Sequence, residues 1–286
     1  MKQLFIFAFS VLALVSCNSG TDLPEAIGKP VAAEVTAHIG PVSRAAGTEW
    51  GENDGIGISG VSGTTTYSNV EYKIVNKTLG SFTPVGDGIF YQTTADVVFT
   101  AYYPFTGTNG TAQATITGNT RADNQTAAAQ PGIDYLWAQA TGNYSTKRSV
   151  KFAFDHKMSR LSLTFTSGDG IDVSALTAYS VDGLKMTGTF NTATGVATAT
   201  GNAETLAISD PAQTSLILYP QVTGGSVKIS AVVDGQTYSC NLSIEELEAG
   251  MDYDISIRVS KTGLTVTSCN INAWGNGGSF DGNATL

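Results

Sequence analysis

The sequence has few of the side chains on which enzymes rely. It contains only two histidines and three cysteines among 286 residues. His38 and His156 stand far apart, which predicts ordinary residues of a polar face or a turn rather than a base or a ligand. A zinc site needs three or four ligands at suitable spacing, and the sequence has no such cluster. We therefore expect no catalytic residue, no metal and no cofactor, and a protein that is not an enzyme.

Positive charge is also scarce. Lys and Arg number 15 against 24 Asp and Glu, so the net charge is −9, and the basic residues form no cluster. This balance excludes nucleic acid as a partner held by bulk electrostatics. Charged residues make up only 14% of the chain, whereas glycine occurs 32 times. Such a composition is typical of short strands joined by tight turns, and it argues against long solvated helices.

Two local patterns that could suggest catalysis lack their context. Gly57-Ile58-Ser59-Gly60 resembles a nucleophile elbow, but Val61 takes the second glycine position and no helix is expected to follow. The adjacent pair Glu245-Glu246 cannot flank a sugar ring from two sides, as glycosidase carboxylates must. Neither pattern supports an active site.

A long apolar run occurs at the N-terminus, from Leu4 to Val15. It is shorter than the roughly 20 residues that a permanent membrane span needs, and it has the proportions of a signal peptide. It ends in Leu14-Val15-Ser16-Cys17, which resembles the bacterial lipobox. We therefore expect residues 1–17 to be a lipoprotein signal peptide and Cys17 to carry the lipid, with palmitate among its acyl chains. The alternative is an ordinary signal peptide that happens to contain a cysteine.

Residues 18–44 are predicted to form a tether and a separable first strand. In the stretch from Val31 to Ile39, apolar residues alternate with polar ones, which indicates a half-buried strand that could fill the edge of a sandwich. The inward set would be Val31, Ala33, Val35, Ala37 and Ile39. Gly40-Pro41 ends the strand, and residues 43–47 read as an exposed connector that contains Arg44.

Strand patterns continue to the end of the chain. The clearest hairpin turns at Asp234-Gly235, and a two-residue turn there pairs Ile229 with Cys240 and Val227 with Leu242. A single helical turn could occupy residues 244–248. Other β-rich or alternating runs are 56–61, 70–75, 97–102, 150–154, 161–165 and 253–259. Many short strands predict sandwiches or barrels, and we expect an N-terminal β-sandwich over 45–145 and a C-terminal one over 146–286.

Two thiols remain after acylation, Cys240 on the apolar face of the hairpin and Cys269 in a later strand. An oxidising envelope would permit a disulfide between them. Two unpaired cysteines are equally compatible with the sequence, because the geometry decides.

An ordered set of landmarks resembles the fimbrillin family, which includes type V pilin-like and Mfa-like surface lipoproteins. The landmarks are Arg44-Ala45 with Trp50, residues 54–58, 97–105, 134–138, 152–161 and 247–250, Tyr253, and residues 271–274. Each one is short, but together they cover nearly the whole mature chain in the right order.

The resemblance implies an all-β fold of two tandem transthyretin-like β-sandwich domains and a lipoprotein carried to the outer membrane. It also implies a fimbrial (pilus) subunit for cell adhesion. An arginine-specific protease would cut between Arg44 and Ala45, and other fimbrial subunits would then assemble by donor-strand exchange. A ligand on a host or microbial surface would be a further partner. The chain is short and its end, residues 275–286, is a poor donor strand, which leaves tip, anchor and accessory positions open beside the stalk.

A monomeric glycan-binding surface lipoprotein is the alternative function. Trp50, Trp137 and Trp274, with many tyrosines, could stack on sugars. Two exposed, coplanar aromatic rings beside an acidic or amide side chain would favour that function. A buried but removable first strand would favour the fimbrial subunit.

Overall fold

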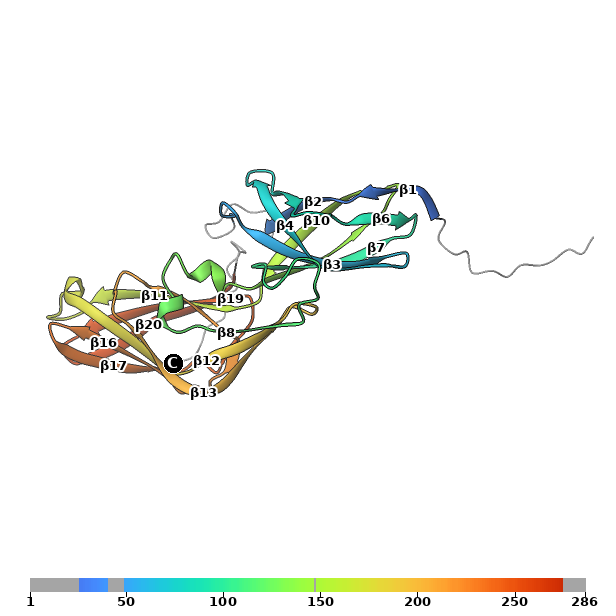
Figure 1. Cartoon of the computed structure of the whole chain (residues 1–286). Coiled ribbons are helices and arrows are strands. Elements are labelled where there is room, and N and C mark those ends of the chain that lie inside the picture. The colour runs from blue at the N-terminus through green and yellow to red at the C-terminus, as the bar shows by residue number, and fades with distance from the viewer. Residues whose placement is uncertain (1–25, 41–48, 147, 275–286) are drawn as a thin grey trace, which may run out of the picture.

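The computed structural model describes residues 26–40, 49–146 and 148–274, and the chain over these ranges is all-β, as the sequence predicts. The strands form two units that lie end to end (Figure 1). The first unit contains β1 (Ala26–Ala32), β2 (Glu34–Ile39), β3 (Gly55–Ser62), β4 (Thr65–Asn76), β5 (Ser81–Pro84), β6 (Phe90–Thr93), β7 (Val97–Tyr103), β9 (Leu136–Gly142) and β10 (Ser149–His156).

The second unit contains β8 (Thr115–Asn119), β11 (Ser159–Ser167), β12 (Leu176–Asn191), β13 (Val196–Ile208), β14 (Ser215–Leu218), β15 (Gln221–Val222), β16 (Val227–Val233), β17 (Gln236–Leu242), β18 (Glu246–Leu247), β19 (Met251–Ser260) and β20 (Gly263–Ala273). The helical elements of the described ranges are short 3₁₀ turns, η1 (Ala122–Asn124), η2 (Gln130–Gly132) and η3 (Val173–Ala175). No helix in these ranges is long and apolar enough to cross a bilayer.

The first unit closes into a barrel. Its strands follow the order β10-β2-β5-β4-β3-β7-β9, and β9 pairs with β10 to complete the ring. Beside the ring, β1 pairs with β6. The core is rich in aromatic rings, among them Tyr72, Tyr91, Phe99, Phe152 and Phe154. A closed ring leaves no free sheet edge while all of its strands are in place.

The second unit is a sandwich of two sheets. One has the order β14-β11-β19-β20, and the other has the order β13-β12-β16-β17, with β8 added to β12. The predicted hairpin is confirmed in its register: Ile229 lies opposite Cys240, and Val227 lies opposite Leu242. Asp234 and Gly235 both have positive φ, 50° and 74°, as the tight turn requires. The helical turn expected over 244–248 is wrong, because Glu246–Leu247 is the strand β18, paired with β15.

The boundary predicted at residues 145/146 is misplaced. β10 lies after it, yet β10 pairs with β2 and β9, and its Phe152 and Phe154 belong to the first core. The last strand of the first unit, β10, ends at His156, and β11 of the second unit begins at Ser159. The alternation of β10 predicts a strand correctly, but it carries no information on which of two similar cores the strand joins.

Residues 115–135, which we call the strap, join the two units. After β7 the chain crosses to the second unit, where β8 pairs with β12, and it then returns to the first barrel as β9. A third apolar cluster fills the space between the units, and in it the ring of Tyr135 stacks on Phe190 with centroids 4.8 Å apart. The two units are therefore connected by packing as well as by the chain.

Candidate functional site

Three of the residues singled out from the sequence, Cys17, Arg44 and Ala45, lie outside the described residues. The described residues that flank the connector are Gly40 on one side and Glu49 on the other. The candidate site is therefore built from the strand before the connector and from the residues that hold this strand.

The strand predicted over 31–39 is present, but it is divided at Ala33. Residues 26–32 form β1 and pair with β6, whereas residues 34–39 form β2 and enter the barrel. The alternation is confirmed in β2, where Val35, Ala37 and Ile39 are buried. Val31 and Ala33 are half-buried. The expectation of an edge strand is wrong, because β2 has a partner on each side.

β2 lies between β10 and β5. Its six residues run parallel to Ser149–Phe154 of β10, and Val35 and Thr36 lie opposite Phe82 and Ser81 of the antiparallel β5. Parallel pairs need no tight turn between them, which is why strands more than 100 positions apart can meet here. Removal of β2 would leave unpaired the backbone groups of β10 that face it, and it would open the ring.

Trp50 fastens β2 from the far side of the connector. Its indole Nε1–H donates a hydrogen bond of 2.9 Å to the carbonyl oxygen of Ala37, and the side chain is only 4% exposed. Its ring packs edge-on against Phe82, Tyr103 and Phe154, with centroids 5.1, 5.6 and 5.5 Å away. Trp50, which lies three residues after the connector, therefore contacts both neighbours of β2.

Gly80 supports β2 from the turn that precedes β5. Its carbonyl oxygen accepts a hydrogen bond of 2.8 Å from the Ala37 N–H, and its φ is +59°. A Cβ atom at this position would come within 2.0 Å of the Ala37 carbonyl oxygen. Glycine is thus needed both for the left-handed backbone and for the close approach of β2.

Cys240 and Cys269 are free thiols, each half-buried against the core of the second unit. Burial raises the pKa of both thiols, and the carboxylate of Asp254 raises the pKa of Cys269 further. A raised pKa lowers the thiolate fraction at neutral pH, and with it the reactivity of the thiol. Of the two arrangements that the sequence leaves open, the structure has the unpaired one.

A polar and aromatic cluster at the junction of the units was missed by the sequence analysis. His156 is buried, its Nδ1 lies 2.9 Å from Asp134 Oδ1, and its ring stacks on Trp274 at 3.9 Å. The guanidinium of Arg160 lies 4.9 Å from the same indole, and its Nη2 donates to Asp252 Oδ2 at 2.6 Å. The sequence does indicate that His156 points inward, because this residue continues the alternation of inward side chains at Phe152 and Phe154.

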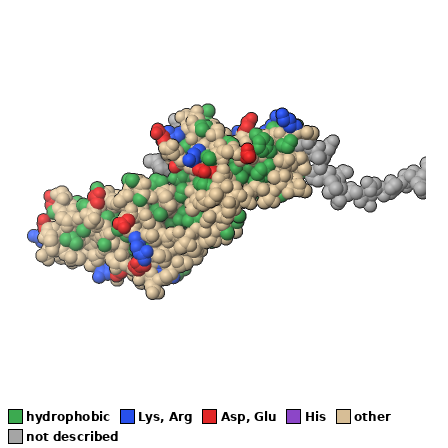
Figure 2. Space-filling model, in the orientation of Figure 1, with side chains coloured by type: hydrophobic (Ala, Val, Ile, Leu, Met, Phe, Trp, Pro, Cys, Tyr) green, Lys and Arg blue, Asp and Glu red, His purple; other side chains and the backbone are tan. Residues whose placement is uncertain are grey.

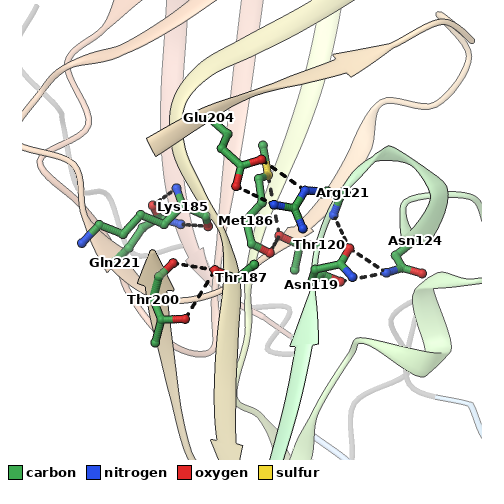
Figure 3. A network of polar contacts seen from close by, with 10 residues as sticks. All are labelled: Asn119, Thr120, Arg121, Asn124, Lys185, Met186, Thr187, Thr200, Glu204 and Gln221. Carbon is green, nitrogen blue, oxygen red and sulfur yellow. Dashed lines mark hydrogen bonds and ion pairs between the residues drawn. The ribbon is translucent and has the colours of Figure 1, made fainter. Parts of the chain in front are cut away.

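Polar contacts attach the strap to the second unit (Figure 3). Arg121 forms a two-pronged ion pair with Glu204 of β13, at 2.6 and 3.1 Å. The buried amide of Gln125 donates to the carbonyl oxygens of Thr120 and Ile217, and its oxygen accepts from the Ile217 N–H. These contacts hold the strap against the second unit.

A cavity of about 350 Å³ opens at this junction. Its apolar walls come from Ile39, Leu136, Ile217 and Trp274, among others. Its charged lining consists of the carboxylates of Glu49, Asp54 and Asp134 and the guanidinium of Arg160. The described residues contain no group of three or more His, Cys, Asp or Glu side chains placed to hold a metal ion.

The tryptophans do not form an exposed platform. Trp50 and Trp274 are buried, and Trp137 is half-buried with its Nε1 donating to the Thr192 carbonyl oxygen at 3.0 Å. The large apolar side chains that are exposed in the described ranges are all aliphatic. Figure 2 shows charged side chains scattered over the visible face, without a large patch of one sign. None of the three indoles therefore offers the open ring face that the glycan hypothesis requires.

Two tandem β-units, the first closed by the chain's own N-terminal strand, define the class of fold. The chain belongs to the fimbrillin-like family, whose profile matches residues 43–274. No curated protein sequence matches it.

Three solved structures of similar fold come from species of Bacteroides. A candidate cell adhesion protein from Bacteroides ovatus is 29% identical, with a TM-score of 0.76 over 86% of this chain and 98% of the other. A second candidate cell adhesion protein, from Bacteroides uniformis, is 24% identical, with a TM-score of 0.72 over 86% and 99%. A fimbrial protein from Bacteroides vulgatus is 13% identical, with a TM-score of 0.54 over 85% and 99%. The last two show likeness of fold alone.

Proposed function

We propose that this chain is a subunit of a bacterial fimbria, with an adhesive and structural role, in which residues 26–39 hold the place of a strand from another subunit. The observation that carries the proposal is the position of β2 in the barrel. It is the barrel strand nearest the N-terminus, and it has a partner strand on each side. Two comparisons support the role: the fimbrillin-like family match and the cell adhesion description of the 29% identical structure.

The first strand has the properties of a placeholder. It is joined to the barrel by a connector that contains Arg44, and the family match begins at residue 43, after β1 and β2. The matched region is thus close to the chain that would remain after a cut between Arg44 and Ala45. An arginine-specific protease is the partner that this step requires.

Burial of the β2 side chains keeps the placeholder in position before the cut. Val35, Ala37 and Ile39 together contribute several kcal/mol, at about 25 cal/mol per Å² of apolar surface. After the cut, the loss of this contribution is offset when a strand from another subunit buries similar side chains and pairs with β5 and β10. An unpaired strand edge is a template for such an addition.

The N-terminal sequence supports a surface location for the subunit. Acylation of Cys17 would anchor the precursor in the outer membrane with the barrel outside the cell. Assembly into the fimbrium would follow the cut, and a ligand on a host or microbial surface would be the target of adhesion.

The test is gel filtration of the purified chain with its fimbrial partner subunits, before and after an arginine-specific protease. The wild type should form oligomers only after treatment. Arg44→Lys keeps the positive charge but removes the cut, so it should stay monomeric under the same protease. It should form oligomers after a lysine-specific protease instead. A treated wild type that stays monomeric with its partners present would rule out strand exchange.

A further inference from the structure

The path of β2 ends at the cavity between the two units. Ile39, the last residue of β2, lines the cavity, and the next N–H, that of Gly40, still donates to the Phe154 carbonyl oxygen at 2.7 Å. A strand that replaces β2 in the same direction therefore leaves the barrel here, and its following residues enter or cross the cavity. This step rests on the strand exchange proposed above.

The walls of the cavity carry more negative than positive charge. Glu49, Asp54 and Asp134 provide three carboxylates, whereas Arg160 provides one guanidinium. Asp252 already neutralises that guanidinium through a contact of 2.6 Å. Asp54 is occupied by the Gly51 N–H and the Tyr103 hydroxyl, at 2.6 and 3.1 Å. Glu49 and one oxygen of Asp134 are therefore the acceptors best placed for an incoming cation.

A second feature of the cavity is the apolar part of its wall. Trp274 and Ile217 in the same wall offer apolar surface to the aliphatic stem of a long side chain.

We propose that this cavity binds the residues that follow the incoming strand, and that it selects a Lys or Arg side chain among them. Glu49 and Asp134 bind the cation, and Trp274 and Ile217 contact the aliphatic stem of the same side chain. The cavity thereby provides a second recognition site beside the barrel. It binds the residues that follow the strand, so it favours the strand direction that places these residues in the cavity. The occupant is a basic segment of another subunit.

The acceptor for the test is the full chain after the cut by the arginine-specific protease, confirmed on a gel as a single cut. The probes are labelled, amidated peptides with the sequence of residues 31–40, whose register in the barrel is known, extended by Ser-Lys or by Ser-Gln. Equilibrium binding is measured at low salt and again at about 0.5 M salt. The Ser-Lys peptide should bind about three- to tenfold more tightly, and high salt should reduce this preference.

The variants locate the preference in the cavity. Asp134→Asn and Glu49→Gln should each weaken the preference for the Ser-Lys peptide, while Asp87→Asn, an exposed carboxylate of the same unit outside the cavity, should leave it unchanged. Glu49→Gln keeps the test decisive if Asp134→Asn disturbs the His156 contact. Equal binding of both peptides to the wild type would overturn this inference and leave strand exchange intact. Failure of both peptides to bind would count against strand exchange itself, and the inference would fall with it.

Discussion

The indole Nε1 of Trp50 donates a hydrogen bond of 2.9 Å to the carbonyl oxygen of Ala37, so the residues on the two sides of the connector are bonded directly to each other. Ala37 belongs to the strand that we propose is released, and Trp50 belongs to the part that remains. This contact therefore opposes release even after the connector has been cut.

Trp50→Phe should loosen the first strand. The variant keeps an aromatic ring in the core but loses the hydrogen bond, at a cost of about 1 kcal/mol of unfolding free energy. Trp137→Phe is the matched control, because it loses an indole hydrogen bond to Thr192 away from β2. Both variants should lose similar stability in urea, but only Trp50→Phe should speed the release of the cut N-terminal peptide, by about fivefold. Equal release from the two variants would show that Trp50 does not fasten β2.

Gly80→Ala should destabilise the uncut chain more than Gly110→Ala. Both glycines have positive φ, 59° and 79°, so both variants carry the cost of a left-handed backbone, about 1–2 kcal/mol. At Gly80 the new Cβ also meets the Ala37 carbonyl oxygen, whereas at Gly110 no atom lies within 4 Å. Urea unfolding should give an additional loss of about 1–3 kcal/mol for Gly80→Ala. Equal losses of stability in the two variants would mean that the Ala37 carbonyl oxygen of β2 does not restrict the space at Gly80.

Alkaline pH should destabilise the first barrel. Burial, with a smaller repulsion from Tyr72, raises the pKa of Tyr91 from 10.0 to about 12. A phenol whose pKa is raised on folding binds its proton more tightly in the native state than in the unfolded state. Its contribution to the free energy of unfolding is therefore fully present below pH 10, and it is lost as the pH rises towards 12. Urea unfolding at pH 8, 10 and 11, followed by tyrosinate absorbance, should show this fall. Tyr91→Phe should make it shallower, and an unchanged slope in that variant would contradict the assignment.

Lipidation should depend on Cys17 alone. Cells that express the wild type should incorporate a fatty-acid analogue into the protein, and Cys17→Ala should abolish the label. Cys240→Ala and Cys269→Ala serve as controls and should keep it, because both thiols belong to the second unit. Label that persists in Cys17→Ala would exclude the lipoprotein interpretation.

The local parts of this fold could be predicted from the sequence, and the non-local parts could not. The Asp234-Gly235 turn determines the register of its hairpin, because a two-residue turn fixes which residues face each other. The alternation of Val35, Ala37 and Ile39 likewise predicts which face of β2 is buried. Both features depend on residues that are close together in the chain.

The neighbours of β2 and the limits of the two units depend on distant residues. The parallel pairing of β2 with β10 has no turn that would reveal it, and so β2 was expected at an edge and β10 in the second unit. The junction cluster was missed for the same reason, since Asp134, His156 and Trp274 come from three separate segments. Parity with Phe152 and Phe154 indicates that His156 points inward, but it cannot indicate the indole on which the ring stacks.

The central claim is that the first strand is removed and replaced when the subunit assembles. Mass spectrometry of the N-terminus of the chain, purified from assembled fimbriae, tests this claim most directly. The account predicts that the assembled chain begins at Ala45 and that residues 26–39 are absent from the fibre. Assembled chains that still begin at an acylated Cys17 and retain residues 26–39 would contradict it.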